Sequence, residues 1–254
     1  MKVNVIGDIH GRTNWKDLVI EDGINVFVGD YFDPYDNISE DDLMINFTDI
    51  CDFKRKRPET VLLYGNHDFH YIVPYYGGST SRYSRIGAPK FKELFEDSQN
   101  LFHGISYAPD SKHIITHAGI TKDWLDDYLD RDDFTGIYLE DGSKVPTTRE
   151  MELFINQLWW DSKDSDNHPE KCEFSFEKNR TSWDTYGTTP TQSPIWVRPN
   201  TLANHNIYQG TGVVQIVGHT QIKDLADLSE EHGLVLIDCL GQVTKSYVFE
   251  SDMQ

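Results

Sequence analysis

Five short apolar runs along this chain each end in a cluster of Gly, Asp, Asn or His residues. The runs with their clusters read VIGDIHG (5–11), FVGDYFD (27–33), LLYGNHD (62–68), IITHAG (114–119) and QIVGHT (215–220). Apolar runs of this length that alternate with helix-like stretches are typical of α/β proteins. Because such proteins build their sites at the carboxyl ends of the strands, we expect the clusters to meet at one edge of a sheet.

Other stretches extend the α/β pattern along the chain. Strands are predicted at 2–6, 24–28, 60–64, 113–116, 213–217, 234–238 and 242–249. Helices are predicted at 41–53 with Ser39 as N-cap, at 122–129 with Thr121 as N-cap, and after a capping box of Thr147 and Glu150.

The length of 254 residues fits one large α/β domain. We expect residues 1–254 to form a single domain with two irregular segments. The stretch at about 74–90 is rich in Gly, Ser, Tyr and Arg without periodicity, which indicates a loop or lid. The stretch at about 161–200 is polar and rich in turn residues, which indicates an insertion. A segment that long without regular structure usually has a functional or ordering reason.

The charge of the chain bears on its partners. With 42 acidic residues against 23 Lys plus Arg, the formal net charge is −19. This charge opposes binding to polymeric nucleic acid, which needs Lys and Arg on the phosphates. A small phosphorylated substrate is still compatible, since bound divalent cations reverse the local field. The acidic runs at 39–42, 126–133 and 161–166 are interpreted as solvated faces.

The sequence also predicts the compartment. No stretch approaches the roughly 18 consecutive apolar residues of a membrane span, so no membrane partner is expected. The first residues lack the apolar region of a secretory signal. Three widely spaced cysteines argue against a disulfide framework or a cysteine zinc site. These observations predict a cytoplasmic protein.

The strand-end clusters contain a set of nitrogen and oxygen ligands: Asp8, His10, Asp30, Asn66, His117 and His219. Each residue alone is more often a turn former, a helix cap or an ordinary polar residue. Together they indicate a metal site. Imidazole and carboxylate without thiolate suit Mn, Fe, Zn, Ni or Co rather than a structural zinc. Six ligands are too many for one tetrahedral ion. They suit two ions roughly 3.5–4 Å apart that share a carboxylate.

The motifs D-x-H, G-D, G-N-H-[DE], H-A-G and G-H over residues 5–240 resemble those of the calcineurin-like metallophosphoesterases. GDIHG, GNHD, HAG and GHT are most similar to the phosphoprotein-phosphatase branch, and Gln221 replaces the second His of a G-H-x-H ending. LLYGNHDFHYI and ITHAGITKDW further resemble bacterial symmetrical diadenosine tetraphosphate hydrolases. The resemblance implies a β-sandwich of two mixed sheets flanked by helices, in four αββα layers, with the metal site at the carboxyl ends of the strands.

The resemblance also implies roles for residues. Asp8 and His10 would hold a first metal, and Asp30 would bridge both ions. Asn66, His117 and His219 would hold the second. His67 would be the general acid that protonates the leaving oxygen, and Asp33 would orient its imidazole and favour the protonated ring. The cofactors would be two divalent ions, Mn first, with Fe, Zn, Ni or Co as alternatives.

One motif departs from the phosphatase branch, which usually reads G-D-x-V-D-R-G. Here the run is GDYFDPY, so Pro34 stands where the branch has a phosphate-binding Arg. Arg198 is the first candidate for the missing cation, and Arg82 and Arg85 are the second; each is otherwise an ordinary surface Arg.

Aromatic residues offer a further possible substrate contact. LWWD at 158–161 resembles the L-W-x-D segment that lines the site in the same branch, which makes Asp161 a candidate substrate contact. Four tryptophans either stack on an aromatic substrate group or belong to the core: Trp159, Trp160, Trp183 and Trp196.

The leading hypothesis is a dinuclear-metal phosphomonoesterase in which a metal-bridging hydroxide attacks phosphorus in line. Its substrate would be a phosphoprotein, a nucleotide or a small phosphorylated molecule. The alternative is a symmetrical dinucleoside polyphosphate hydrolase. A phosphodiesterase or nuclease, and a binding module that kept only the fold, are less favoured.

Overall fold

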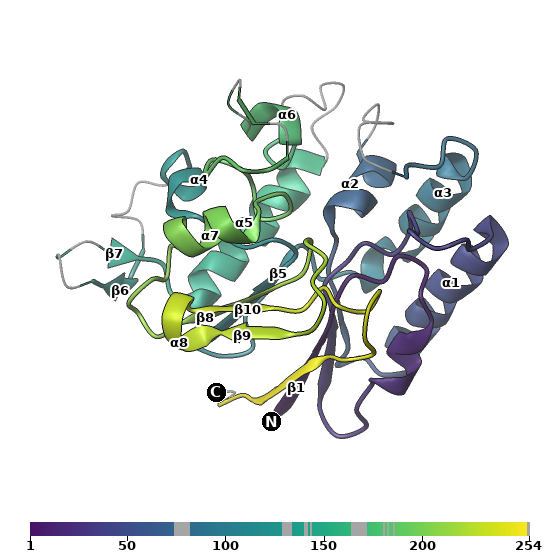
Figure 1. The fold of residues 1–254 in the computed structure, drawn as a ribbon, viewed down its shortest axis with the longest axis horizontal. Coiled ribbons are helices and arrows are strands. Elements are labelled where there is room, and N and C mark those ends of the chain that lie inside the picture. The colour runs from purple at the N-terminus through teal and green to yellow at the C-terminus, as the bar shows by residue number, and fades with distance from the viewer. Residues whose placement is uncertain are drawn as a thin grey trace.

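The computed structural model describes residues 1–73, 82–128, 134–139, 142, 144–163, 172–179, 181, 183–184 and 186–252. These residues form two mixed sheets, a short hairpin, and helices on both sides of the sheets (Figure 1). The predicted α/β fold class is confirmed.

The first sheet has the strand order β11-β1-β2-β3 and the second has the order β4-β5-β8-β10-β9. The first consists of β1 (Lys2–Ile6), β2 (Ile24–Phe27), β3 (Val61–Leu62) and β11 (Tyr247–Glu250). The second consists of β4 (Ser106–Tyr107), β5 (His113–Thr116), β8 (Val214–Val217), β9 (Ala226–Leu228) and β10 (Leu234–Leu236). Strands β6 (Ile137–Tyr138) and β7 (Lys144–Val145) form the hairpin.

The inner strands of both sheets are parallel. In the first sheet β1 pairs with β2, and β2 with β3, in parallel. In the second sheet β8 pairs in parallel with both β5 and β10. Edge strands β11, β4 and β9 pair antiparallel with their neighbours. The parallel strands of each sheet therefore end at a common edge, where functional residues can gather.

The helices are α1 (Glu40–Lys56), α2 (Asn66–Ile72), α3 (Ala88–Ser98), α4 (Lys122–Asp126), α5 (Thr148–Lys163), α6 (Phe176–Asn179), α7 (Pro199–His205) and α8 (Ser229–His232). Two 3-10 turns, η1 (Asn14–Asp17) and η2 (Gln99–Leu101), complete the described elements. No helix in the described ranges is long and apolar enough to cross a membrane. Within the described residues the three cysteines are buried and form no disulfide bond.

The two sheets pack face to face through alternating apolar side chains. Val3 and Val5 of β1 and Val26 of β2 share one buried cluster with Ile115 of β5 and Ile216 of β8. Because successive side chains of a strand point to opposite faces, the other set of apolar residues is free to pack against helices. The result is a sandwich with an apolar interior between the sheets.

Helices cover the outer faces of the sandwich. On the first sheet, Phe27 of β2 meets Phe53 of α1 with ring centroids 6.4 Å apart. On the second sheet, α5 packs against β4 and β5, and Leu202 of α7 packs with Val217 and Leu236. Figure 1 shows α1 and α3 on one side of the molecule and α5 and α7 on the other. The arrangement agrees with the four expected layers.

Several predicted elements lie where the sequence placed them. Strands β1 and β5 match the predictions residue for residue. The N-cap side chains of Ser39 and Thr121 accept hydrogen bonds from the backbone of Asp42 and Trp124. Local capping and apolar runs therefore sufficed for these elements.

Three predicted segments show the largest differences from the structure. Strand β11 begins only at Tyr247, because Gln242 and Val243 donate to the carbonyl of Cys239 in a turn. The 74–90 loop ends earlier than predicted, since α3 begins at Ala88; residues 74–81 lie outside the described residues. The 161–200 segment contains the end of α5, all of α6 and the start of α7, so its described part has regular structure.

Candidate metal centre

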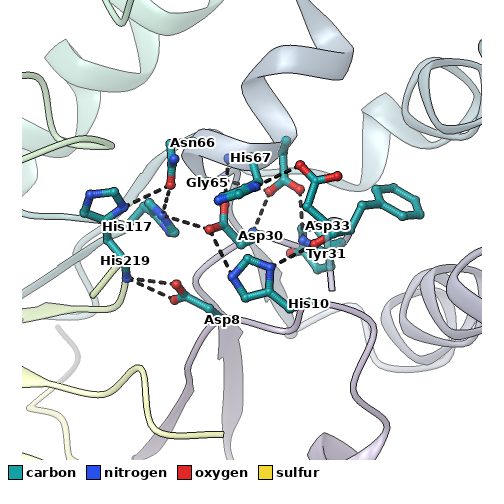
Figure 2. A network of polar contacts seen from close by, with 12 residues as sticks. Asp8, His10, Asp30, Tyr31, Asp33, Gly65, Asn66, His67, His117 and His219 are labelled. Atoms are coloured by element: carbon teal, nitrogen blue, oxygen red, sulfur yellow. Dashed lines mark hydrogen bonds and ion pairs between the residues drawn. The ribbon is translucent and has the colours of Figure 1, made fainter. Parts of the chain in front are cut away.

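The six predicted ligands come from the carboxyl ends of strands in both sheets. Asp8 and His10 follow β1, Asp30 follows β2, and Asn66 begins α2 just after β3. His117 follows β5, and His219 follows β8. Figure 2 shows these side chains gathered at one edge of the sandwich, with Asp30 in the middle. The structure thus brings together residues more than 200 positions apart.

Asp30 lies between two imidazoles. Its Oδ2 atom is 3.6 Å from Nε2 of His10 and 3.4 Å from Nε2 of His117. Its Oδ1 atom accepts a hydrogen bond from the backbone N–H of His67 at 2.9 Å, which fixes the carboxylate. Ligand atoms of Asp8, Asp30 and His117 lie within 4.8 Å of one another, and so do those of His10, Asp30 and His67. One carboxylate therefore belongs to two possible ligand groups.

Asn66 and two histidines converge beside Asp30. Oδ1 of Asn66 lies 2.8 Å from Nε2 of His117 and 3.0 Å from Nδ1 of His219. Asp8 also contacts this group. Its two carboxylate oxygens accept the backbone N–H of His219 at 3.1 and 3.0 Å.

Backbone carbonyls determine which ring nitrogens face the centre. Nδ1 of His10 lies 2.9 Å from the carbonyl oxygen of Phe32, and Nδ1 of His117 lies 2.9 Å from that of Val28. A carbonyl only accepts, so Nδ1 carries the proton in both rings and Nε2 presents a lone pair. In the neutral ring, Nε2 of His117 and Oδ1 of Asn66 are then two acceptors in contact. A cation between them satisfies both, so these residues fit a divalent metal.

Burial makes every charge at the centre costly without a counterion. Burial, followed by the neighbouring Asp238, raises the pKa of Asp8 well above its usual value. Burial, followed by Asp8, does the same for Asp30. Burial lowers the pKa of His117 to about 3, so this ring is neutral at physiological pH. Clustered carboxylates with neutral imidazoles are the donor set that divalent cations stabilise.

The backbone at the centre is held in an uncommon conformation. Positive φ angles occur at His10 (44°), Asp30 (55°), Asp33 (57°) and His219 (65°), none of which is glycine. Such residues cost of order 1–3 kcal/mol each and persist where the surroundings fix them. Because four such residues occur at this one site, we infer that the conformational cost is tolerated in order to orient these side chains.

Asp68 is one of the residues that fix this backbone. Its carboxylate accepts the backbone N–H of Asp30 at 2.7 Å, of Tyr31 at 2.9 Å and of Gly65 at 2.8 Å. Sequence reasoning did not assign it a role. The available signal was its place as the last residue of GNHD, at the start of a helix, where an acid caps free N–H groups.

Asp238 and Arg12 also have no role assigned from the sequence. Asp238 is buried, and its charge helps to raise the pKa of Asp8. Burial raises the pKa of Asp238 itself to about 6, against the lowering effect of Arg12. It follows β10 in the run LVLID, which is the same signal that identified the other strand-end residues. Arg12, directly after GDIHG, keeps only 9% of its side chain exposed.

His67 and Asp33 form the predicted pair. Nδ1 of His67 lies 2.8 Å from Oδ2 of Asp33, and both side chains are buried (Figure 2). The His67 ring meets the His10 ring edge-on, with centroids 5.0 Å apart. The carboxylate holds Nδ1, so Nε2 is the atom of His67 that can exchange a proton with a bound molecule.

Two of the predicted substrate-binding arginines lie beside the centre. Nη1 of Arg198 donates to Oγ1 of Thr220 at 3.0 Å and lies 3.5 Å from the carbonyl of His219. The guanidinium of Arg82 lies over the Tyr35 ring at 5.3 Å, and that ring meets His10 edge-on at 5.0 Å. Both cations are therefore connected to residues of the metal centre.

The other predicted contacts are placed differently. Arg85 is exposed, and no described contact joins it to the centre. Asp161 is exposed on α5 and accepts a hydrogen bond from Gln157 at 2.7 Å, because Trp159 occupies the buried face of that helix. Trp159 and Trp196 are core residues and Trp160 is partly buried, whereas Trp183 is 88% exposed.

Gly218 makes room for the Asp8 carboxylate. A Cβ atom at this position would lie 2.1 Å from Oδ1 of Asp8, far inside van der Waals contact. We therefore expect Gly218→Ala to displace Asp8 and to lower the metal content of the purified protein. Inductively coupled plasma mass spectrometry measures this content. Gly210→Ala is the control for backbone strain without a clash, because its φ is +79° and nothing lies within 4 Å of a Cβ there. Equal metal content in the two variants would contradict this role of Gly218.

The comparisons with known proteins were consistent with this geometry. A family model described as calcineurin-like phosphoesterase matches residues 1–222. No curated protein matches the chain.

Proposed function

Because the chain belongs to the calcineurin-like phosphoesterase family and is therefore a metal-dependent hydrolase of phosphate esters, we propose that it is a phosphomonoesterase with a dinuclear centre. The observation that carries the proposal is the position of Asp30 Oδ2 between the two imidazole nitrogens of His10 and His117. A single carboxylate oxygen shared in this way suits two neighbouring ions better than one.

We assign Asp8, His10 and Asp30 to the first ion, and Asp30 with three further residues to the second: Asn66, His117 and His219. Divalent ions held there supply Lewis-acid activation of water and of the phosphate oxygens. Mn²⁺ is the first choice for reconstitution, since imidazole, carboxylate and amide ligands all suit it.

The protein's own groups then complete the reaction. His67 donates the Nε2 proton to the leaving oxygen as its bond to phosphorus breaks, and Asp33 keeps the ring oriented through Nδ1. Arg198 binds the phosphate oxygens in place of the cation that Pro34 cannot supply. A guanidinium suits this task because its planar fork matches phosphate geometry.

The hydrogen bonds that hold Arg198 in place fit this role. Its backbone N–H donates to the Gly187 carbonyl at 2.9 Å, and its Nε donates to the Tyr186 carbonyl at 2.7 Å. The turn that contains these carbonyls is held by Asp184, whose Oδ1 accepts the backbone N–H groups of Tyr186 and Gly187 at 3.1 and 2.8 Å. The guanidinium is thus pre-positioned before substrate binds.

We expect Arg198→Ala to raise KM for p-nitrophenyl phosphate about 10- to 100-fold, equivalent to the ~1.5–3 kcal/mol that hydrogen bonds to charged groups contribute. Arg198→Lys should lie between this variant and the wild type, because it keeps the charge without the fork. Arg55→Ala, at an exposed pair with Asp52, is the control. An unchanged KM with Arg198→Ala would show that another group binds the phosphate.

A second candidate function is hydrolysis of dinucleoside polyphosphates. It is favoured by Tyr35, whose ring adjoins His10 yet remains 45% exposed, and which therefore offers a surface for a nucleobase. The two functions are separated by a panel on the Mn²⁺-loaded protein: p-nitrophenyl phosphate, its bis ester, a phosphopeptide and diadenosine tetraphosphate. Preference for either monoester supports the proposal, whereas preference for diadenosine tetraphosphate or the bis ester overturns it.

A further inference from the structure

The carboxylate of Asp33 contacts two side chains of one short helix. Its Oδ2 atom lies 2.8 Å from Nδ1 of His67, and its Oδ1 atom accepts a hydrogen bond from the hydroxyl of Tyr71. His67 and Tyr71 are four residues apart on α2, so their side chains lie one turn apart on the same face. Each oxygen of the carboxylate thus has its own partner, and α2 holds both.

This arrangement is enclosed. Asp33 is 0% exposed and Tyr71 is 3% exposed. Burial, and then the charge of Asp33, raise the pKa of the Tyr71 phenol, so the hydroxyl stays neutral and acts as a donor. A buried carboxylate oxygen that lost this donor would have to turn toward another or remain unsatisfied.

The phenol itself is fixed from the other side. The backbone N–H of Ser84 donates to the Tyr71 hydroxyl oxygen at 3.1 Å. The ring stacks on Tyr83 with centroids 4.9 Å apart and meets Phe91 edge-on at 5.3 Å. Tyr71 therefore accepts from one fixed group and donates to another, which leaves its O–H with one direction.

We propose that Tyr71 is a positioning residue for proton donation: its hydroxyl fixes the Asp33 carboxylate so that His67 presents Nε2 to the leaving oxygen. The inference rests on the proposed role of His67 as general acid. In the step, the oxygen of the attacking water bonds to phosphorus, the bond between phosphorus and the leaving oxygen breaks, and the leaving oxygen takes the Nε2 proton. The Nδ1 proton stays between His67 and Asp33, and Tyr71 keeps its own proton.

The inference predicts an effect that depends on the leaving group. A poor leaving group needs the proton in the transition state, whereas p-nitrophenolate leaves with little help. We expect Tyr71→Phe to lower kcat about tenfold for phenyl phosphate and less than about twofold for p-nitrophenyl phosphate, a fraction of the ~10²–10⁴ that general acid catalysis contributes. KM and metal content should not change, because the ring and its stacking remain.

Tyr208→Phe provides the matched control. It also removes a buried phenol hydroxyl, which in Tyr208 lies 3.5 Å from the carbonyl of Thr147. If loss of such a hydroxyl lowers stability in general, Tyr208→Phe and Tyr71→Phe should lower the unfolding temperature by similar amounts. In Tyr208→Phe the ratio of kcat for phenyl phosphate to kcat for p-nitrophenyl phosphate should stay as in the wild type. A Tyr71→Phe variant that slows both substrates equally would overturn the inference.

The same experiment separates this inference from the function on which it rests. His67→Asn should change the kcat ratio strongly, and adding Tyr71→Phe to it should cause no further loss, since both changes act on one proton transfer. A His67→Asn variant with an unchanged ratio would refute the general-acid assignment. A changed ratio in His67→Asn, with additive losses in the double variant, would refute only the role of Tyr71.

A spectroscopic readout requires no turnover. In the metal-free protein, the proton NMR signal of His67 Nδ1–H is expected downfield, is identified by its absence in His67→Asn, and should shift in Tyr71→Phe but not in Tyr208→Phe. An unmoved signal in Tyr71→Phe would show that the Asp33 carboxylate keeps its position without the phenol, against the inference.

Discussion

Replacing Asp30 by Asn is expected to remove both metal ions at once. The Oδ2 atom of Asp30 faces His10 and His117 together, and an amide nitrogen cannot replace a shared carboxylate oxygen. Loss of the several kcal/mol of charge stabilisation that metals supply corresponds to at least about a 10³-fold fall in hydrolysis. The measurement is metal content per chain after dialysis, together with kcat on p-nitrophenyl phosphate.

Asp8→Asn provides the comparison within the site. Asp8 belongs to one side of the centre in our assignment, so its replacement should lower the affinity for the first ion and leave the second bound. Asp161→Asn, at an exposed acid on α5, should leave both ions in place. If Asp30→Asn kept the wild-type metal content, Asp30 would not be the shared ligand.

Replacing His67 by Asn is expected to lower kcat by about 10²–10⁴, the usual contribution of a general acid. Its Nδ1 atom is held by Asp33, and its ring adjoins that of His10, so Nε2 is the nitrogen left to donate a proton beside the proposed metal centre. Metal content should equal that of the wild type, because the six assigned ligands remain. Steady-state kinetics and metal analysis on the same preparation test both parts.

The structure also permits a different role for His67, that of a metal ligand. Ligand atoms of His67, His10 and Asp30 lie within 4.8 Å of one another, so the geometry alone would also permit His67 as a ligand. A variant that lost metal in proportion to activity would support that reading and contradict the general-acid assignment. The hydrogen bond to Asp33 favours the general-acid role, because it holds Nδ1 and leaves Nε2 to face a bound molecule.

The strand-end residues were predictable because the signal is local. Each apolar run that leads into a Gly, Asp or His cluster marks a buried strand and its carboxyl end. Parallel pairing then brings Asp8 and Asp30 to one edge of the first sheet, and His117 and His219 to one edge of the second. The same rule also points to Asp238, which follows β10. The sandwich itself came from the family resemblance, because periodicity alone does not say how two sheets pack.

Other features depend on contacts between distant segments. Tyr71 meets Asp33 across 38 positions, and nothing near either residue indicates the hydrogen bond. Asp161 and Arg85 were chosen from motif similarity and proximity in sequence, yet α5 turns Asp161 outward to bury Trp159. Helix α3 is not among the predicted helices, because the Gly and Ser residues before it indicate a loop to about residue 90; the burial of Phe91 and Phe95 gives this segment its apolar face.

Titrating chelator-stripped protein with Mn²⁺, while bound metal and hydrolysis of p-nitrophenyl phosphate are recorded together, tests the central claim most directly. We predict negligible activity without metal and full activity only as the second ion binds, because Asp30 serves both positions. Turnover that is complete with one ion bound, or that persists without metal, would contradict a dinuclear phosphomonoesterase.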